Sequence, residues 1–229
     1  GAGKTILAML DQDSAHVSQT QPELMIYSAG DLNIDEFLLK IKPDVIAIGP
    51  GLGKSNLAKT WLTKVLHHSL PLILDADALN LISESKDLLM ALKKRDVESI
   101  ITPHPGEAAR LLNVSIEAIQ NDRETSIQNL IKLTHAITVL KGHQTLVGSK
   151  DHPVQKCMEG NAGMATAGMG DTLAGIMAGL VAQFGLSLET VTKAVLAHAL
   201  AGDAAAQAGE RGLLATDLLS PLRSLLNKQ

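Results

Sequence analysis

The chain has 229 residues, 45% of them hydrophobic, so it can bury one sizeable core, and we expect a single domain over residues 1–229. A net charge of −4, with one Trp, one Tyr and two Phe, offers neither the basic surface nor the stacking rings that nucleic-acid binding needs. The single cysteine forms no internal disulfide, and no apolar run reaches the ~20 residues of a membrane span. We therefore expect a cytoplasmic protein that binds neither nucleic acid nor membrane. Because the chain opens on GAGKT without Met, we also expect it to be part of a longer protein.

Short β-branched runs alternate with longer helical patterns along the chain. The first strand is expected at TILAML (5–10), after a turn at Gly1 and Gly3. The opening GAGKT also resembles the end of a phosphate-binding P-loop, but the glycine that this motif needs five positions before Gly3 is not in the chain. Further strands are expected at 45–49, 72–76, 97–101 and 137–142, with helices between them. This alternation predicts an α/β fold with a mostly parallel sheet that helices cover on both faces.

The second half of the sequence changes pattern after the strand at 137–142. Residues 144–147 and 154–158 are expected to form an antiparallel extension on either side of a turn at 148–151. The chain then becomes helical. Helices are predicted at 170–184, 187–208 and 216–226, the last of them capped by Thr216 or Asp217.

Glycine-rich and polar motifs follow the predicted strands. In open α/β sheets, ligands bind in the crevice outside the carboxyl ends of the strands. The loops that end strands should therefore meet, together with the glycine-rich loop, around one cleft. These loops are GPGLGK (49–54), DADALN (75–80), TPHPGE (102–107) and KGHQT (141–145), and the glycine-rich loop is GNAGMATAGMGD (160–171).

The glycine-rich loop leads directly into a helix built from small apolar residues. Glycines let backbone N–H groups approach a ligand closely, and the first helical turn adds unpaired donors and the positive end of the dipole, a combination that binds phosphate. Asp171 lies at the same helix end, where it can take a proton near a bound phosphate. The alternative is that Asp171 is a helix N-cap after a flexible loop.

The other loops also have structural alternatives. Gly49, Gly51 and Gly53 either contact a ligand or only turn a strand into a helix, and their G-x-G-x-G spacing is not the dinucleotide fingerprint. Asp75 and Asp77 can cap the helix that follows them.

His104 is flanked by Pro103 and Pro105, which fix the backbone around it, so it is either a functional residue or a structural hydrogen-bonding residue. Lys141 follows a buried strand and can face a phosphate or solvent. His198 and Asp203 lie in a predicted helix rich in Ala and Gly, and we interpret them as packing or interhelical bonding residues.

With these motifs in order, the chain resembles the ADP- or ATP-dependent NAD(P)H-hydrate dehydratase family, whose members have a ribokinase-like fold. The resemblance rests on GPGLG, DADALN, TPHPGEAARLL, KGHQT and GNAGMATAGMGDTLAGI and extends from about residue 44 to residue 219. It implies a repair reaction in which hydrated NADH or NADPH loses water while ADP or ATP is hydrolysed. The family's domain begins some tens of residues earlier, so the resemblance also implies that an N-terminal segment is missing.

The resemblance assigns residues to each ligand and implies a homo-oligomer, a homotetramer. Mg²⁺ is expected to bridge the nucleotide phosphates through water, and no residue is assigned as a metal ligand. Asp171 is the expected catalytic base and also contacts the hydrated dinucleotide. The other expected contacts of the hydrated dinucleotide are Gly51, Gly53, His104, Pro105, Gly106, Glu107 and Arg110. Those of ADP or ATP are Lys141, Gly142, His143, Gln144, Thr145, Asn161, Ala162, Gly163, Met164, Ala165, Thr166, Ala167, Gly168, Met169 and Gly170.

Two other functions fit the same motifs. One is a small-molecule kinase of the same fold, for example for a vitamin-precursor alcohol, because variants of TPHPGE and DADALN also occur among such kinases. The other is a nucleotide-binding fragment without turnover.

Overall fold

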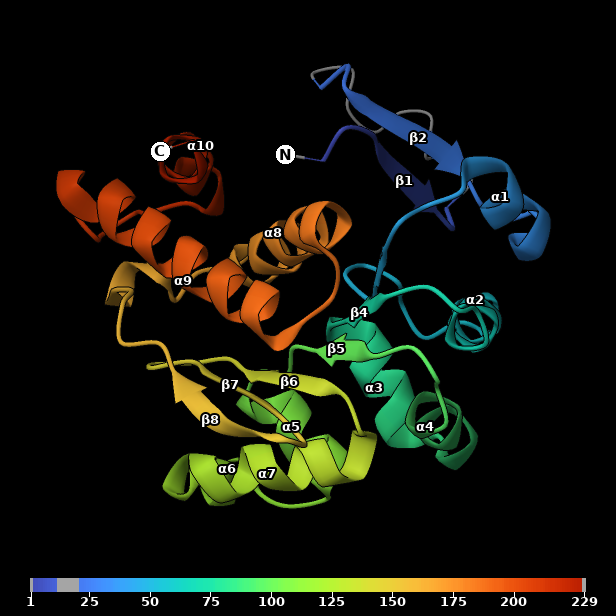
Figure 1. The fold of residues 1–229 in the computed structure, drawn as a ribbon, viewed down its shortest axis with the longest axis horizontal. Coiled ribbons are helices and arrows are strands. Elements are labelled where there is room, and N and C mark those ends of the chain that lie inside the picture. The colour runs from blue at the N-terminus through green and yellow to red at the C-terminus, as the bar shows by residue number, and fades with distance from the viewer. Residues whose placement is uncertain (1, 12–20, 228–229) are drawn as a thin grey trace.

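A six-stranded sheet forms the centre of the molecule (Figure 1). The computed structural model describes residues 2–11 and 21–227. Four neighbouring strands are parallel, and the last two add to one edge in antiparallel orientation. In spatial order they are β3 (Ile46–Ile48), β4 (Leu72–Leu74), β5 (Ser99–Ile101), β6 (Ile137–Leu140), β7 (Leu146–Ser149) and β8 (His152–Lys156).

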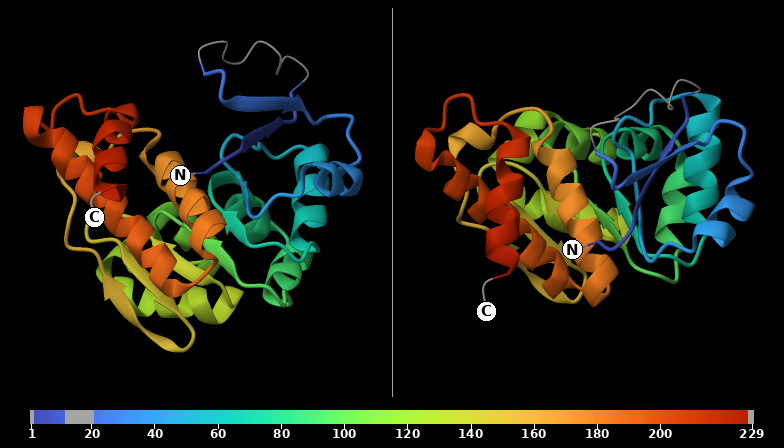
Figure 2. Two further views of the ribbon diagram at one scale, coloured as in Figure 1. Left: turned by 45° about the horizontal axis from the view of Figure 1, so that its top comes forward. Right: turned by 90° about the horizontal axis from the view of Figure 1, so that it is seen from above.

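Helices cover both faces of this sheet, as Figures 1 and 2 show. Alternate strand residues point to opposite faces, so Ile73 and Ile100 pack with one helix layer while Leu72 and Leu74 pack with the other. The first layer consists of α8 (Met169–Phe184) and α9 (Leu188–Ala205). The second contains α2 (Asn56–Leu66), α3 (Ala76–Glu84), α4 (Lys86–Lys93), α5 (Pro105–Leu112), α6 (Ile116–Asn121) and α7 (Arg123–Thr134).

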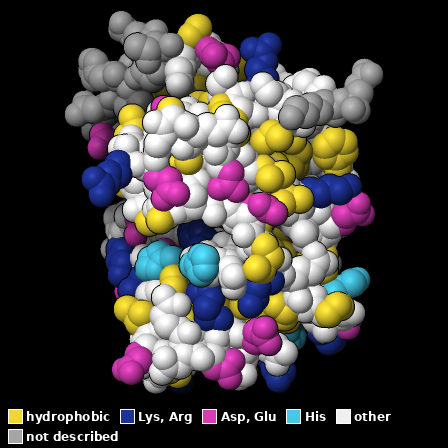
Figure 3. All heavy atoms as spheres, turned by 90° about the vertical axis from the view of Figure 1, so that its left-hand side faces the viewer, with side chains coloured by type: hydrophobic (Ala, Val, Ile, Leu, Met, Phe, Trp, Pro, Cys, Tyr) yellow, Lys and Arg dark blue, Asp and Glu magenta, His cyan; other side chains and the backbone are white. Residues whose placement is uncertain are grey.

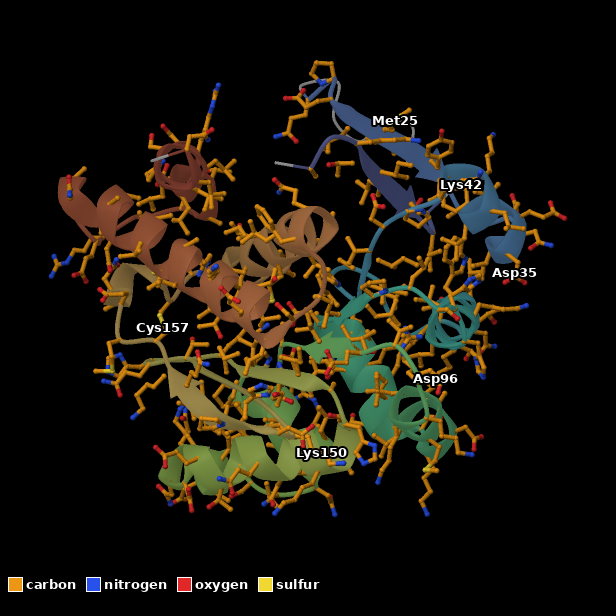
Figure 4. The ribbon with its side chains drawn as sticks, viewed as in Figure 1. Met25, Asp35, Lys42, Asp96, Lys150 and Cys157 are labelled. Carbon is orange, nitrogen blue, oxygen red and sulfur yellow. The ribbon has the colours of Figure 1, made fainter. Side chains whose placement is uncertain are left out.

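The N-terminal part forms a separate parallel pair, β1 (Thr5–Met9) with β2 (Leu24–Ser28), followed by α1 (Ile34–Ile41). Phe37 and Trp61 belong to the apolar cluster that packs α1 against α2. Asp35, labelled in Figure 4, accepts hydrogen bonds from Lys64 and His68 of the α2 end, which joins the same two helices on the outside. The bond from Lys64, and then that from His68, lowers the pKa of Asp35.

The C-terminal part follows the predicted helices but differs at the last cap. Three 3₁₀ helices flank the last α-helices: η2 (Ala162–Met164) precedes α8, η3 (Ala206–Ala208) follows α9, and η4 (Ala215–Leu218) precedes α10 (Leu219–Leu226). The prediction that Thr216 or Asp217 caps the last helix is wrong, because both lie inside η4. Asp217 instead accepts the backbone N–H of Leu214 at 2.9 Å, so its carboxylate closes the 3₁₀ turn that leads into α10.

The sheet and its alternation with helices confirm the predicted α/β fold. The expected antiparallel extension is β7 and β8, and the strand expected at 5–10 is β1. β2 was not predicted, and Gly1, half of the expected first turn, lies outside the described residues. Within the described ranges, no helix is long and apolar enough to cross a membrane.

Candidate functional site

Three of the strand-end loops are joined by a chain of side-chain hydrogen bonds. The Gly53 N–H donates to Asp77 Oδ2 at 2.8 Å, and Asn80 Nδ2 donates to Asp77 Oδ1 at 3.4 Å. Asn80 Oδ1 in turn accepts from Arg110 Nε at 2.8 Å. The predicted substrate residues Gly53 and Arg110 are therefore brought together through DADALN, as the shared edge of parallel strands requires.

The glycines after β3 have backbone conformations that other residues rarely adopt. Gly51 and Gly53 have φ of 64° and 72°. At Gly49, with φ 132°, a Cβ would lie 1.7 Å from the backbone oxygen of Asp75. Gly49 therefore has a packing role, whereas Gly51 and Gly53 are exposed on the loop.

His104 caps α5 while half of its side chain stays accessible. Its ring Nδ1 accepts the Gly106 N–H at 2.9 Å, and the His104 backbone N–H donates to Glu107 Oε2 at 2.8 Å. These two bonds form a capping box, and Pro105 occupies the first helical position. The side chain of His104 is 51% exposed, but that of Glu107 is only 5% exposed. His104 Nε2 also lies 3.3 Å from Glu107 Oε1, so both ring nitrogens face groups of the cap, which bears out the structural hydrogen bond expected for His104. The Glu107 carboxylate is engaged inside the fold.

Lys141 forms a buried ion pair with Asp75. Lys141 Nζ lies 2.6 Å from Asp75 Oδ1, with the two side chains 17% and 2% exposed. Asp75 also caps α3 by accepting the Ala76 N–H at 2.9 Å, which confirms the capping interpretation for this aspartate. A Cβ placed on Gly170 would be 3.2 Å from Lys141 Nζ, so the ammonium lies against the first turn of α8 and not in open solvent.

The remainder of the KGHQT loop is hydrogen-bonded to Arg123, the first residue of α7. Arg123 donates to the carbonyl oxygens of Leu140 and Lys141, and a Cβ on Gly142 would lie 3.0 Å from Arg123 Nη1. Thr145 Oγ1 donates to the Gly142 carbonyl at 3.0 Å. His143 is exposed, and Gln144 has φ 54°. The loop is thus fixed by its own bonds and by Arg123, a residue that no motif in the sequence marks.

Asp171 is exposed in the first turn of α8. The helix is capped by Gly168 in the left-handed region, with φ 83°, and no side chain of the described residues provides a cap hydrogen bond. The alternative that Asp171 is the N-cap is therefore wrong, because Asp171 is the third residue of the helix. The first-turn N–H groups lack intrahelical partners and face the same end as this carboxylate.

The side chains of the glycine-rich loop divide into exposed and packed ones. Met169 is buried in the C-terminal apolar cluster, and Met164 packs against it and against Gly202. Because its side chain is buried, Met169 can contact a ligand only through its backbone. The exposed residues of the loop are Gly160, Ala162, Ala165, Thr166, Ala167 and Asp171.

Two residues of α9 contact this loop and its helix. His198 lies against the Met169 backbone at the start of α8, in keeping with the packing or interhelical interpretation, and burial lowers the pKa of His198 to about 4. Asp203 bonds to Gly160 and Asn161, so the packing or interhelical interpretation of Asp203 is wrong. The glycine next to it, Gly202, is the sequence signal for such a close approach.

The surface view in Figure 3 shows His and Lys or Arg side chains gathered next to a hollow on one face, with acidic side chains above them. Among the described residues, no group of three or more His, Cys, Asp or Glu side chains could hold a metal ion.

The sequence profile described as NAD(P)H-hydrate dehydratase matches residues 1–223. The chain belongs to this family. It is 46% identical over 229 residues to the bifunctional NAD(P)H-hydrate repair enzyme Nnr of Coxiella burnetii, covering 99% of this chain and 45% of that protein. It is 36% identical over 214 residues to the ADP-dependent (S)-NAD(P)H-hydrate dehydratase of Neisseria meningitidis, covering 90% and 69%. The chain thus spans less than half of the length of the bifunctional relatives.

Solved structures support the same fold. The ADP/ATP-dependent NAD(P)H-hydrate dehydratase of Bacillus subtilis, co-crystallised with ATP/Mg²⁺ and soaked with CoA, superposes with a TM-score of 0.74 at 27% identity, covering 90% of this chain and 74% of that one. A ribokinase-like superfamily protein of Enterococcus faecalis gives a TM-score of 0.80 at 31% identity, covering 99% and 77%. The fold is therefore ribokinase-like, as expected.

Proposed function

We propose that this chain, as a single dehydratase domain, dehydrates hydrated NADH or NADPH back to NADH or NADPH and consumes ADP or ATP. The observation that carries the proposal is the exposed Asp171 in the first turn of α8, with the Lys141–Asp75 pair against the same turn. Because Gly53 after β3 and Arg110 of α5 are joined through Asp77 and Asn80 after β4, a dinucleotide and an adenine nucleotide can meet there. Family membership supplies the substrate class.

The chemistry follows from the poor leaving ability of hydroxide. Asp171 takes the proton of the ring hydroxyl as this oxygen attacks the terminal phosphoryl group of the nucleotide. The backbone N–H groups of Gly168 to Asp171 stabilise the negative charge on the transferred group. The ring nitrogen then expels phosphate, and loss of a proton from the adjacent ring carbon restores the double bond. The hydroxyl oxygen leaves in the phosphate, so the net reaction is dehydration coupled to nucleotide hydrolysis.

The binding assignments form part of the same proposal. The hydrated dinucleotide contacts the exposed part of the His104 side chain, Gly51 and Gly53 after β3, and Arg110 of α5. Pro105, Gly106 and Glu107 form the first turn of α5 at the same place. The adenine nucleotide contacts residues 141–145 and 161–170. Mg²⁺ arrives with the nucleotide, held by its phosphates and water. We place the protein in the cytoplasm as a homotetramer.

The test is to incubate the chain with hydrated NADH and with ADP or ATP in turn. Recovery of the absorbance of the reduced nicotinamide, dependent on nucleotide, is the expected result. A stable phosphorylated alcohol would indicate a kinase instead. Thermal stabilisation by nucleotide without any turnover would reduce the chain to a nucleotide-binding protein.

A further inference from the structure

The start of the glycine-rich loop is bonded to the C-terminal half of α9 through one carboxylate. Asp203 Oδ2 accepts the backbone N–H of Gly160 at 2.9 Å, and Asp203 Oδ1 accepts from Asn161 Nδ2 at 2.9 Å. The two bonds join residues that are more than forty positions apart in the sequence. Hydrogen bonds to a charged acceptor are stronger than those between neutral groups, so this contact fixes where the loop begins.

The same loop lies so close to α9 that no side chain fits between them. A Cβ on Gly202 would lie 2.3 Å from Met164 Sδ, and a Cβ on Gly163 would lie 2.5 Å from the Glu210 carbonyl oxygen. The loop therefore rests directly on this helix and on the turn after it. A shift of the loop would have to break the Asp203 bonds first, since these are its charged contacts with α9.

Asp203 also decides which way the amide of Asn161 faces. Its carboxylate accepts only from the NH₂ group, which turns Asn161 Oδ1 away to a buried position without a hydrogen-bond partner in the described part of the chain. A buried acceptor without a partner favours rearrangement of the segment that carries it. The charge on Asp203 opposes that rearrangement.

The far end of the loop is fixed independently. Thr172 Oγ1 donates to the Gly168 carbonyl at 2.9 Å, and the Met169 side chain is buried in the C-terminal apolar cluster. Loss of the Asp203 bonds should therefore release residues 160–164 without moving Asp171, which follows this anchored end. Nucleotide binding should therefore weaken, whereas the rate of the chemical step at Asp171 should stay the same.

We propose that Asp203 is a positioning residue that holds the glycine-rich loop in its nucleotide-binding conformation and so sets the affinity for ADP or ATP. The inference rests on the proposed function, because it requires an adenine nucleotide at this loop. Asp203 acts through Gly160 and Asn161 and does not itself touch the reacting atoms.

The variant Asp203→Asn tests this role, because it keeps one oxygen for the Gly160 N–H but replaces the charged acceptor of Asn161 Nδ2 by a neutral amide. We expect the Kd for ADP and ATP, measured by titration calorimetry, to rise about tenfold, the effect of losing one hydrogen bond to a charged group. At saturating nucleotide, kcat and the KM for the hydrated dinucleotide should stay within about threefold of the parent values. Hydrogen exchange should quicken in the segment 160–164.

Asp217→Asn is the matched control, because Asp217 also accepts one backbone N–H at 2.9 Å in the C-terminal part of the chain but lies outside the loop. It should leave nucleotide Kd unchanged. Asp203→Asn with unchanged nucleotide Kd, or with Kd, kcat and both KM values altered equally, would overturn the positioning role while leaving the proposed function in place. A parent chain that binds neither ADP nor ATP would overturn both. Should Asp203→Asn fail to fold, Asp203→Glu moves the carboxylate by one methylene group and should also raise the nucleotide Kd with kcat unchanged. An unchanged Kd in that variant would overturn the positioning role.

Discussion

Replacing Lys141 by Ala should destabilise the fold strongly, although Lys141 lies at the end of a strand. The change removes the cation 2.6 Å from Asp75 and leaves a carboxylate that is only 2% exposed. Breaking a buried ion pair from one side costs about 3 to 5 kcal/mol. Asp75 retains the hydrogen bond from the Ala76 N–H, so we expect the lower end, about 3 kcal/mol. In a chain of this size that loss lowers Tm by roughly 6 to 12 °C.

Thermal unfolding followed by circular dichroism measures this effect. Lys150→Ala is the matched control, because Lys150 is exposed at the turn between β7 and β8 (Figure 4), and its Tm should match that of the parent. Adding Asp75→Asn to Lys141→Ala removes the uncompensated charge and should restore at least half of the lost stability. The double variant should still bind ADP or ATP about tenfold or more weakly, because the cation against α8 is absent. A Lys141→Ala chain that melts within about 2 °C of the parent would refute the buried-pair reasoning.

Two further predictions concern histidines. Because burial holds the pKa of His198 near 4, below its ordinary 6.5, the unfolded chain binds the extra proton first, and stability should fall as pH drops from about 6.5 toward 4. Urea unfolding should show a slope of up to about 1.4 kcal/mol per pH unit that His198→Gln reduces, and an equal slope in both proteins would contradict this origin. His104→Ala removes the α5 cap and should cost about 1 kcal/mol while raising the KM for the hydrated dinucleotide more than the nucleotide Kd. An equal rise in both constants would show that His104 acts only as a helix cap and not as a substrate contact.

The sequence was sufficient to predict the sheet and the loops that follow its parallel strands. β-branched runs that end in glycine or polar motifs locate β3 to β6 and the loops after them, because a strand buried on both faces needs a continuous apolar run. The pairing of β1 with β2 was not predictable in the same way, because the local sequence of a strand does not specify its parallel partner, and residues 10–23 separate the two strands.

Contacts between residues far apart in the sequence are the part of the site that the sequence does not predict. Asp75 and Lys141 were each recognised as strand-end residues, but their pairing over 66 positions depends on β4 and β6 being brought to the same edge of the sheet. Asp203 was recognised only as part of a helix rich in small residues. The structure places the glycine-rich loop, and not another helix, against Gly202.

Substitution of Asp171 by Asn tests the central claim most directly. Asn has nearly the same shape, and Asp171 makes no side-chain cap bond within the described chain, so stability and nucleotide affinity should hardly change. In the nucleotide-dependent repair of hydrated NADH, followed by the absorbance of the reduced nicotinamide, Asp171→Asn should lose kcat by about 10² to 10⁴, the range for removing a general base. An Asp171→Asn chain that repairs hydrated NADH at close to the parent rate would contradict the assignment of Asp171 as the base.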